Sequence, residues 1–108
     1  MNRTSRLAVL GTALAGLLTP LLLQPAQAAT PSYVALGDSY ASGTGTRSYI
    51  ADGTSCQRST SAYPSLIAAA RGYALNFRAC SGATVTDVTN TQLSALTAST
   101  SYVSISVG

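Results

Sequence analysis

The residues best suited to chemistry form a short polar turn, Gly37-Asp38-Ser39-Tyr40, directly after the apolar run 32–36. A serine hydroxyl becomes a nucleophile when a neighbouring base takes its proton. If the run is a strand, Ser39 projects from its carboxyl end, where open parallel sheets bind their ligands. A short helix beginning there would offer free N–H groups to an oxyanion. Gly-Asp-Ser is also ordinary turn composition, so the tripeptide alone does not separate a nucleophile from a surface turn.

Other site patterns fail at named positions. Gly43-Thr44-Gly45 is not followed by Gly-Lys-Ser/Thr, which excludes a phosphate loop. Ser48 stands where a dinucleotide fingerprint needs its third glycine, and no Gly-x-Ser-x-Gly elbow surrounds Ser39. The two cysteines lack C-x-x-C spacing and the chain has no histidine or glutamate, which argues against zinc. We therefore expect neither a metal nor a cofactor.

The elements that must position Ser39 follow an alternating order. Short apolar or alternating runs predict three strands, at 32–36, 73–79 and 102–107. A helix is predicted between the first two, and a less regular one, rich in threonine, at 84–96. The Ser-, Thr- and Gly-rich stretch 41–60 reads as a loop, and loops of this length are often functional.

The first helix has the clearest pattern. Tyr63, Leu66, Ile67 and Ala70 fall on one helical face. Ser61 is expected to cap its start, and Pro64 suits a first turn that needs no N–H donor. Arg71 then favours the last turn, and Gly72 the left-handed stop.

Strands that alternate with helices predict right-handed crossovers and a parallel sheet. Both faces of such a sheet need helices. The chain ends at Gly108, directly after an apolar strand, which would leave an unpaired edge and a poorly covered face. We therefore expect the natural sequence to continue.

The amino terminus is typical of an export signal. Arg3 and Arg6 precede an apolar run, Leu7–Leu23, and Ala26-Gln27-Ala28 is the small-x-small pattern that precedes cleavage. The run is short for a membrane span, so residues 1–28 are predicted to be a signal peptide, and the protein to be secreted without a stable membrane anchor. The formal charge of +3 includes both of these arginines. The remaining charges are scattered, so the basic balance gives no evidence for nucleic-acid binding.

Two cysteines, Cys56 and Cys80, remain in the predicted mature region 29–108. In an exported chain they are most simply a disulfide. In the chain-entropy model, closing a loop of this size stabilises a fold by roughly 3 kcal/mol.

The stretch 33–43, which reads Tyr-Val-Ala-Leu-Gly-Asp-Ser-Tyr-Ala-Ser-Gly, resembles the first signature block of the GDSL/SGNH hydrolases. It is similar in particular to their secreted actinobacterial lipase and esterase branch, which often has tyrosine after the serine. Two later stretches also match, Cys56-Gln57-Arg58-Ser59 leading to Tyr63-Pro64, and 79–84. The closing stretch 104–108 resembles the strand before the family's Gly-Asn-Asp block. The resemblance thus covers essentially all of 29–108.

The resemblance implies an α/β, parallel-sheet, three-layer (flavodoxin-like) SGNH hydrolase fold, with 29–108 as the N-terminal portion of the domain. Ser39 matches the nucleophile, and its N–H matches one oxyanion donor. Gly82 matches the glycine that provides a second donor, although it also suits a simple turn after a strand. Cys56 and Cys80 match the first disulfide of the branch. Asp38 fits a turn or capping role, because the family's triad acid lies beside a C-terminal histidine.

Family members take a third oxyanion donor from an asparagine, and their base from an Asp-x-x-His block, and this chain has neither. Because it also lacks lysine and glutamate, the 108-residue chain is predicted to be inactive by itself. The whole protein is expected to be a monomeric ester hydrolase that acts by acyl transfer on a small-molecule or lipid ester. The alternatives are a non-catalytic exported remnant or binding protein with the same partial fold, and a product that never folds stably. An in-frame continuation past Gly108 would favour the enzyme.

Overall fold

The computed structural model describes residues 29–108, and the predicted signal peptide lies outside the described residues. In this part of the chain a parallel sheet contains β1 (Ser32–Gly37), β2 (Ala74–Phe77) and β3 (Tyr102–Ser106), in the order β2-β1-β3. The predicted strands and their parallel pairing are confirmed. β2 is shorter than predicted because Arg78 and Ala79 both donate their N–H groups to the Ala35 carbonyl, at 2.8 and 3.0 Å, and so leave the regular ladder.

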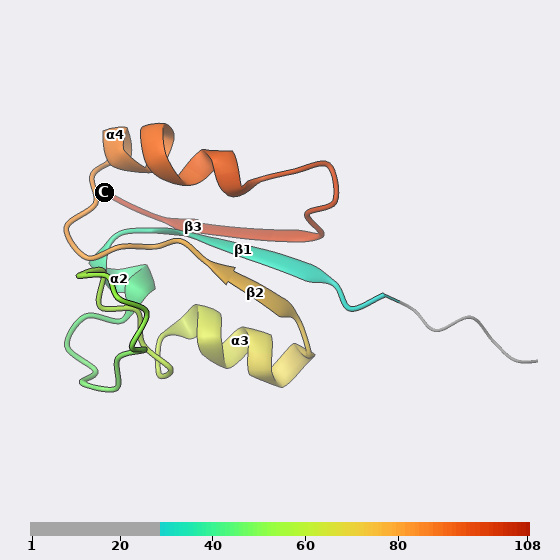
Figure 1. Cartoon of the computed structure of the whole chain (residues 1–108), viewed down its shortest axis with the longest axis horizontal. Helices are drawn as coiled ribbons and strands as arrows, with labels where there is room; N and C mark the ends of the chain where they lie inside the picture. Colours follow the sequence, from blue (N-terminus) through green and yellow to red (C-terminus); the bar gives the residue numbers. More distant parts are fainter. Residues whose placement is uncertain (1–28) are drawn as a thin grey trace, which may run out of the picture.

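Helices cover both faces of the sheet (Figure 1). Side chains of the central strand alternate between the two layers. Tyr33 and Ala35 pack toward α3 (Tyr63–Arg71), whereas Val34 and Leu36 pack toward the helical segment that precedes β3. The fold is therefore the predicted three-layer α/β arrangement, with β1 buried at its centre.

The predicted ends of α3 are only partly correct. Pro64 lies in the first turn, and Gly72 ends the helix in the left-handed conformation with φ of 70°. The predicted Ser61 cap is wrong, because the helix starts after Ala62 without a side-chain cap. The Ser61 hydroxyl instead pairs with the Ser48 hydroxyl at 2.8 Å.

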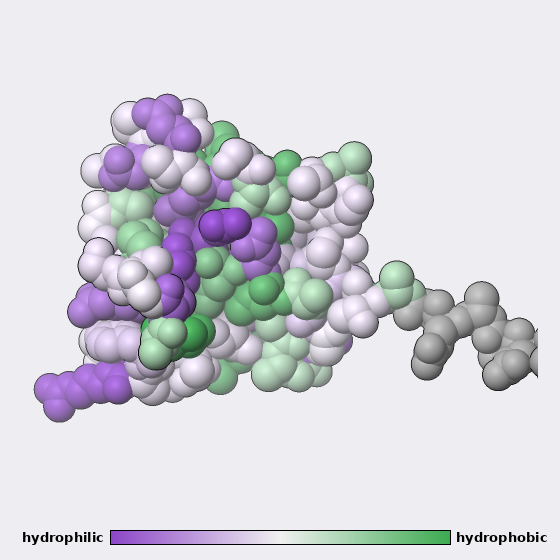
Figure 2. Space-filling model, in the orientation of Figure 1, coloured by the Kyte–Doolittle hydropathy of each residue, from purple (hydrophilic) through white to green (hydrophobic). Residues whose placement is uncertain are grey.

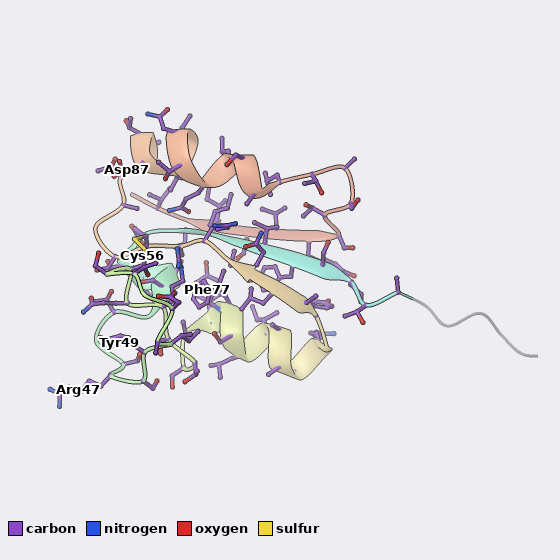
Figure 3. The ribbon with its side chains drawn as sticks, in the orientation of Figure 1. Arg47, Tyr49, Cys56, Phe77 and Asp87 are labelled. Atoms are coloured by element: carbon purple, nitrogen blue, oxygen red, sulfur yellow. A yellow bond between two sulfur atoms is a disulfide. The ribbon has the colours of Figure 1, made fainter. Side chains whose placement is uncertain are left out.

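The apolar stripe of α3 also differs from the prediction. Leu66 and Ile67 are exposed, and the buried residues of the helix are Pro64 and Ala68. The bulky side chains of this layer come from the sheet side, including Tyr33 and half-buried aromatic and aliphatic neighbours (Tyr73, Leu75 and Phe77). Figure 3 shows Phe77 between the sheet and α3. Because the side chains on this face of α3 are small, the helix can approach the bulky sheet surface closely. This explains why Ala68, and not the predicted Leu66, makes the contact.

The second helical segment is irregular. It consists of α4 (Val85–Asp87), a π-helical turn η1 (Val88–Gln92) and a 3₁₀ turn η2 (Leu93–Ala95). Helical structure at 84–96 is thus confirmed in outline, but it is not one continuous α-helix. Thr89 and Thr91 donate their hydroxyls to backbone carbonyls four residues earlier, a bonding pattern that tends to distort helices.

A long loop separates the sheet's first strand from α3. After the short helix α2 (Ser39–Ser42), residues 43–60 contain turns, bends and an isolated bridge between Tyr49 and Ser59. Arg47 extends outward from this loop (Figure 3). The predicted loop is confirmed from residue 43 onward, whereas Ala41 and Ser42 belong to α2.

β3 lies at one edge of the sheet among the described residues, as predicted for the last strand. Val103 and Ile105 are 51% and 57% exposed. Figure 2 shows hydrophobic residues and strongly hydrophilic ones side by side near the middle of the visible face.

Candidate active site

A sharp turn carries the chain from β1 into α2. Gly37 has φ of +147°, which side-chain-bearing residues rarely adopt. A Cβ at this position would clash with the Ser106 carbonyl oxygen and lie 2.7 Å from the Ala41 Cβ. The Asp38 N–H donates to the same Ser106 oxygen at 3.0 Å. Glycine is therefore required here both by backbone conformation and by the lack of space.

Asp38 caps α2. Its Oδ1 accepts the Tyr40 N–H at 3.1 Å, and its Oδ2 accepts the Gly108 N–H at 3.3 Å. The predicted capping role of Asp38 is thus confirmed. Ser39, half-buried, is the first residue of the helix and stands directly at the carboxyl end of the central strand, where its type and position suit a nucleophile.

The segment that carries Gly82 reaches the same edge of the sheet. The Cys80 N–H donates to the Gly37 carbonyl at 3.0 Å, and the Ala83 N–H closes a turn onto the Cys80 carbonyl at 3.1 Å. Gly82, inside that turn, is exposed and has φ of +84°. One hydrogen bond therefore connects the Ser39 turn to the Gly82 turn.

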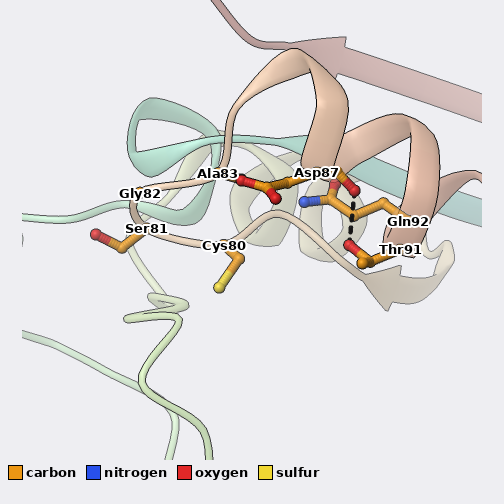
Figure 4. A pocket seen from close by; sticks show the side chains of 7 residues that line it. All are labelled: Cys80, Ser81, Gly82, Ala83, Asp87, Thr91 and Gln92. Carbon is orange, nitrogen blue, oxygen red and sulfur yellow. Dashed lines mark hydrogen bonds between the residues drawn. The ribbon is translucent and has the colours of Figure 1, made fainter.

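Two surface hollows open near these turns. One, of 210 Å³, is lined by Gly82, Asp87 and Gln92 among others (Figure 4). The other, of 250 Å³, is lined by Tyr40, Thr44 and Tyr63 among others. Ser39 itself lines neither hollow.

The electrostatics of the first hollow are set by Asp87. The Thr84 N–H and then the Thr84 hydroxyl donate to its carboxylate, at 2.8 and 3.0 Å, and these bonds hold the pKa of Asp87 below its ordinary value. The Asp87 N–H in turn donates to the Thr84 hydroxyl, and these reciprocal bonds form a capping box. The carboxylate is thus committed to the helix start and is a weak candidate for a general base.

A disulfide joins Cys56 to Cys80, as predicted, and so connects the long loop to the Gly82 turn (Figure 3). The Ser81 N–H reinforces the connection by donating to the Cys56 carbonyl at 2.9 Å. Arg58 adds a further contact, because its Nε donates to the Ala79 carbonyl at 2.9 Å while its Nη1 pairs with Asp52 at 3.0 Å.

The sequence-based interpretation missed Gln92. This side chain is only 4% exposed, its Oε1 accepts the Gly37 N–H at 2.8 Å, and its Nε2 donates to the Gly37 carbonyl at 3.0 Å. A signal was present, since Gln92 follows the apolar residues Val85 and Val88 at helical spacing and so shares a face with them in the predicted helix 84–96. A buried polar residue on such a face needs a partner, and here the partner is the turn before Ser39.

Within residues 29–108, no three His, Cys, Asp or Glu side chains come together in a group that could hold a metal ion. In the same residues no helix has both the length and the apolar character needed to cross a bilayer.

Taken together, the described residues form an α/β parallel-sheet protein with a serine at the end of its central strand. The chain is similar to lipases of Streptomyces. It is 50% identical over 99 residues to lipase 1 of Streptomyces coelicolor, covering 91% of this chain and 36% of that protein. It is 48% identical over 115 residues to a lipase of Streptomyces rimosus, covering 98% of this chain and 42% of the relative.

Two solved structures share the fold. A phospholipase A1 from Streptomyces albidoflavus superposes with a TM-score of 0.68 and 51% identity, over 74% of this chain and 34% of that one. An extracellular lipase from Streptomyces rimosus gives a TM-score of 0.69 and 49% identity, over 73% and 34%. No family model matches the chain. The chain spans between 36% and 42% of the length of the two curated lipases described above.

Proposed function

We propose that this chain is the nucleophile-bearing N-terminal portion of a secreted serine ester hydrolase of the GDSL/SGNH type. The observation that carries the proposal is the position of Ser39, which opens α2 at the carboxyl end of the central strand. The likeness to lipases at 50% and 48% identity supports the reaction class.

In the proposed reaction, the Ser39 Oγ forms a bond to the ester carbonyl carbon while its proton passes to a base. The N–H groups of Ser39 and Gly82 stabilise the oxyanion that develops on the carbonyl oxygen. Collapse of this intermediate expels the alcohol, and water then releases the acid from Ser39. The bond between the Cys80 N–H and the Gly37 carbonyl supports this assignment, because it connects the two turns that would act together.

The base is not among these residues. The sequence contains no histidine, lysine or glutamate, and Asp38 and Asp87 are both engaged in capping. We therefore infer that the purified 108-residue chain hydrolyses no ester by itself. Release of p-nitrophenol from p-nitrophenyl butyrate tests this, and turnover that disappears in Ser39→Ala would contradict it.

The same comparisons support the proposed substrate class. Relatives named lipase and a neighbour named phospholipase A1 favour a lipid or other carboxylic ester. The predicted signal peptide and the likeness to an extracellular lipase favour secretion. We propose a monomer that needs no metal, cofactor or nucleic acid, and no stable membrane anchor.

Covalent labelling tests the nucleophile. The protein is purified from the medium of the organism that encodes it, so that its natural length is used, and is treated with a fluorophosphonate. Mass spectrometry of the peptide around Ser39 should find the phosphonyl adduct on that residue, together with loss of esterase activity. Ser39→Ala should abolish both, whereas Ser94→Ala, an exposed hydroxyl deletion on η2, should leave both unchanged. An exported protein that neither reacts nor hydrolyses esters would favour the non-catalytic binding protein.

A further inference from the structure

A single buried amide holds the peptide groups on both sides of Gly37. Gln92 accepts the Gly37 N–H at 2.8 Å and donates to the Gly37 carbonyl at 3.0 Å. The two bonds form a closed pair between one side-chain amide and one residue's backbone. Because Gln92 is 4% exposed, water cannot easily replace either bond.

The Gly37 carbonyl on β1 accepts hydrogen bonds from two other segments of the chain. It accepts from Gln92 and also from the Cys80 N–H at 3.0 Å, so both of its lone pairs are used. The first bond comes from η1, and the second from the turn that carries Gly82. Ser39 is two residues away along the chain. A change at Gln92 is therefore expected to move the backbone at Gly37, and with it the position of Ser39 relative to Gly82.

The irregular helix explains how Gln92 reaches this point. The Leu93 N–H bonds to the Val88 carbonyl five residues earlier, which makes η1 a π-helical turn. Val88 is buried against Val34 and Leu36, and the capping box at Thr84 fixes the start of the segment. The wide turn thus lies between two anchored points. Such π turns are rare and are frequently found at functional sites.

From these contacts we infer that Gln92 is a positioning residue for the reaction, one that holds the backbone before Ser39 in its reactive geometry. The inference rests on the proposed function. Packing alone does not require an amide here, because an apolar side chain of similar size would also fill the space. Such a side chain would, however, leave the Gly37 N–H without an acceptor and remove one of the two donors to the Gly37 carbonyl. A nucleophile displaced by about 1 Å loses on the order of 10²-fold in rate.

Gln92→Glu tests the pairing directly. A protonated carboxyl has the same shape and can make the same two bonds, since its C=O accepts the Gly37 N–H and its O–H donates to the Gly37 carbonyl. When ionised it cannot donate, and it faces that carbonyl with a negative charge. Burial, Asp38 beside Gly37, and Asp87 in the same hollow all favour the protonated form of the introduced carboxyl.

We expect kcat of Gln92→Glu in the exported enzyme to fall about 10²-fold at pH 8, with KM within about twofold of the parent. The ratio of variant to parent kcat should recover at least about tenfold at pH 6, as the introduced carboxyl gains its proton. Gln92→Met, which cannot titrate, should be impaired equally at both values. Asn90→Asp, an exposed amide-to-acid change on the same turn, should keep the parent's kcat at both.

Active sites are counted by fluorophosphonate labelling, so kcat refers to folded, reactive enzyme and a loss of stability does not imitate a loss of rate. Parent-like kcat in Gln92→Met, or a Gln92→Glu ratio that does not change with pH, would overturn the inference while leaving the Ser39 assignment standing. A parent enzyme that is not labelled at Ser39 would instead remove the proposed function itself.

Discussion

The turn at Gly37–Ser39 and the loop 43–60 both lie at the carboxyl end of the sheet, but they are held by different kinds of contact. The turn is fixed mainly through its backbone, by Gln92, by the Cys80 N–H and by the Ser106 carbonyl. The loop has backbone bonds too, such as that from the Ser59 N–H to the Ser42 carbonyl at 2.7 Å, but it adds side-chain contacts, namely the disulfide, the Arg58 contacts and hydroxyl pairs around the buried Ser59. The turn thus tolerates little change of main chain, whereas individual loop contacts can be removed one at a time.

The largest effect is expected from Gly37→Ala. The new methyl would meet the Ser106 oxygen and the Ala41 Cβ, and φ of +147° adds strain. We expect the free energy of unfolding to fall by about 3 kcal/mol or more, measured by urea denaturation of the exported protein.

Gly45→Ala is the matched control for Gly37→Ala. Gly45 also has positive φ, at +96°, but a Cβ there meets nothing within 4 Å. Only the backbone strain should remain, about 1 kcal/mol. Equal losses in the two variants would show that the close approach at Gly37 contributes nothing.

Removal of the disulfide should have the next largest effect. The double variant Cys56→Ala and Cys80→Ala is expected to lose about 3 kcal/mol at most, because the cross-link restricts the unfolded chain across a separation of 24 residues. Fluorophosphonate labelling of Ser39 should survive in the molecules that remain folded, since the Gln92 bonds do not depend on the cross-link. Loss of labelling in folded protein would mean that the loop helps to hold the turn.

A smaller effect is expected from Arg58→Met, which keeps an apolar stem but deletes the donors to Ala79, Arg78 and Asp52. The charged donor to Ala79 is partly buried, whereas the bonds to Arg78 and Asp52 are exposed, so we expect a loss of about 2 kcal/mol at most by urea denaturation. Arg47→Met, at the outward-pointing arginine of the same loop (Figure 3), should lose less than about 0.5 kcal/mol. Comparable losses would mean that the Arg58 contacts do not stabilise the loop.

Some features of the turn and the loop could be predicted from the sequence, and others could not. The position of Ser39 was predictable because an apolar run, a glycine and a polar turn are local signals. The three strands and their parallel pairing were predictable for the same reason, through the alternation of strand and helix. The Gln92 pairing was not, since it joins residues 55 positions apart and depends on a π turn that no local preference indicates.

Two errors on α3 have a related cause. Ser61 had the type of a helix cap, but a competing hydroxyl at Ser48 engages it. Leu66 and Ile67 had the spacing of a buried face, but the face that meets the sheet is decided by the bulky residues opposite. In both cases a tertiary contact overrode a local pattern, and the partner could not be identified from the sequence.

The smallest expected effect is a loss of stability in acid, and it arises from a residue of the loop and not of the turn. The pKa of Asp52 is held below its ordinary value, first by the hydroxyl and then by the N–H of Thr54, and then by Arg58. A carboxylate with a lowered folded pKa stabilises the protein above its unfolded pKa, and this contribution is lost as pH falls through the folded value. The difference in unfolding free energy between the parent and Asp52→Asn should therefore be present at neutral pH, begin to decline below about pH 4, and disappear only once the pH is below the lowered folded pKa of Asp52. Thr54→Val, which removes the first of these donors, should reduce the difference while leaving the Arg58 pair in place.

Because Asp52 is exposed, added salt should weaken the Arg58 part of the effect. A difference that persists unchanged into acid would show that Asp52 acts through packing and not through its charge.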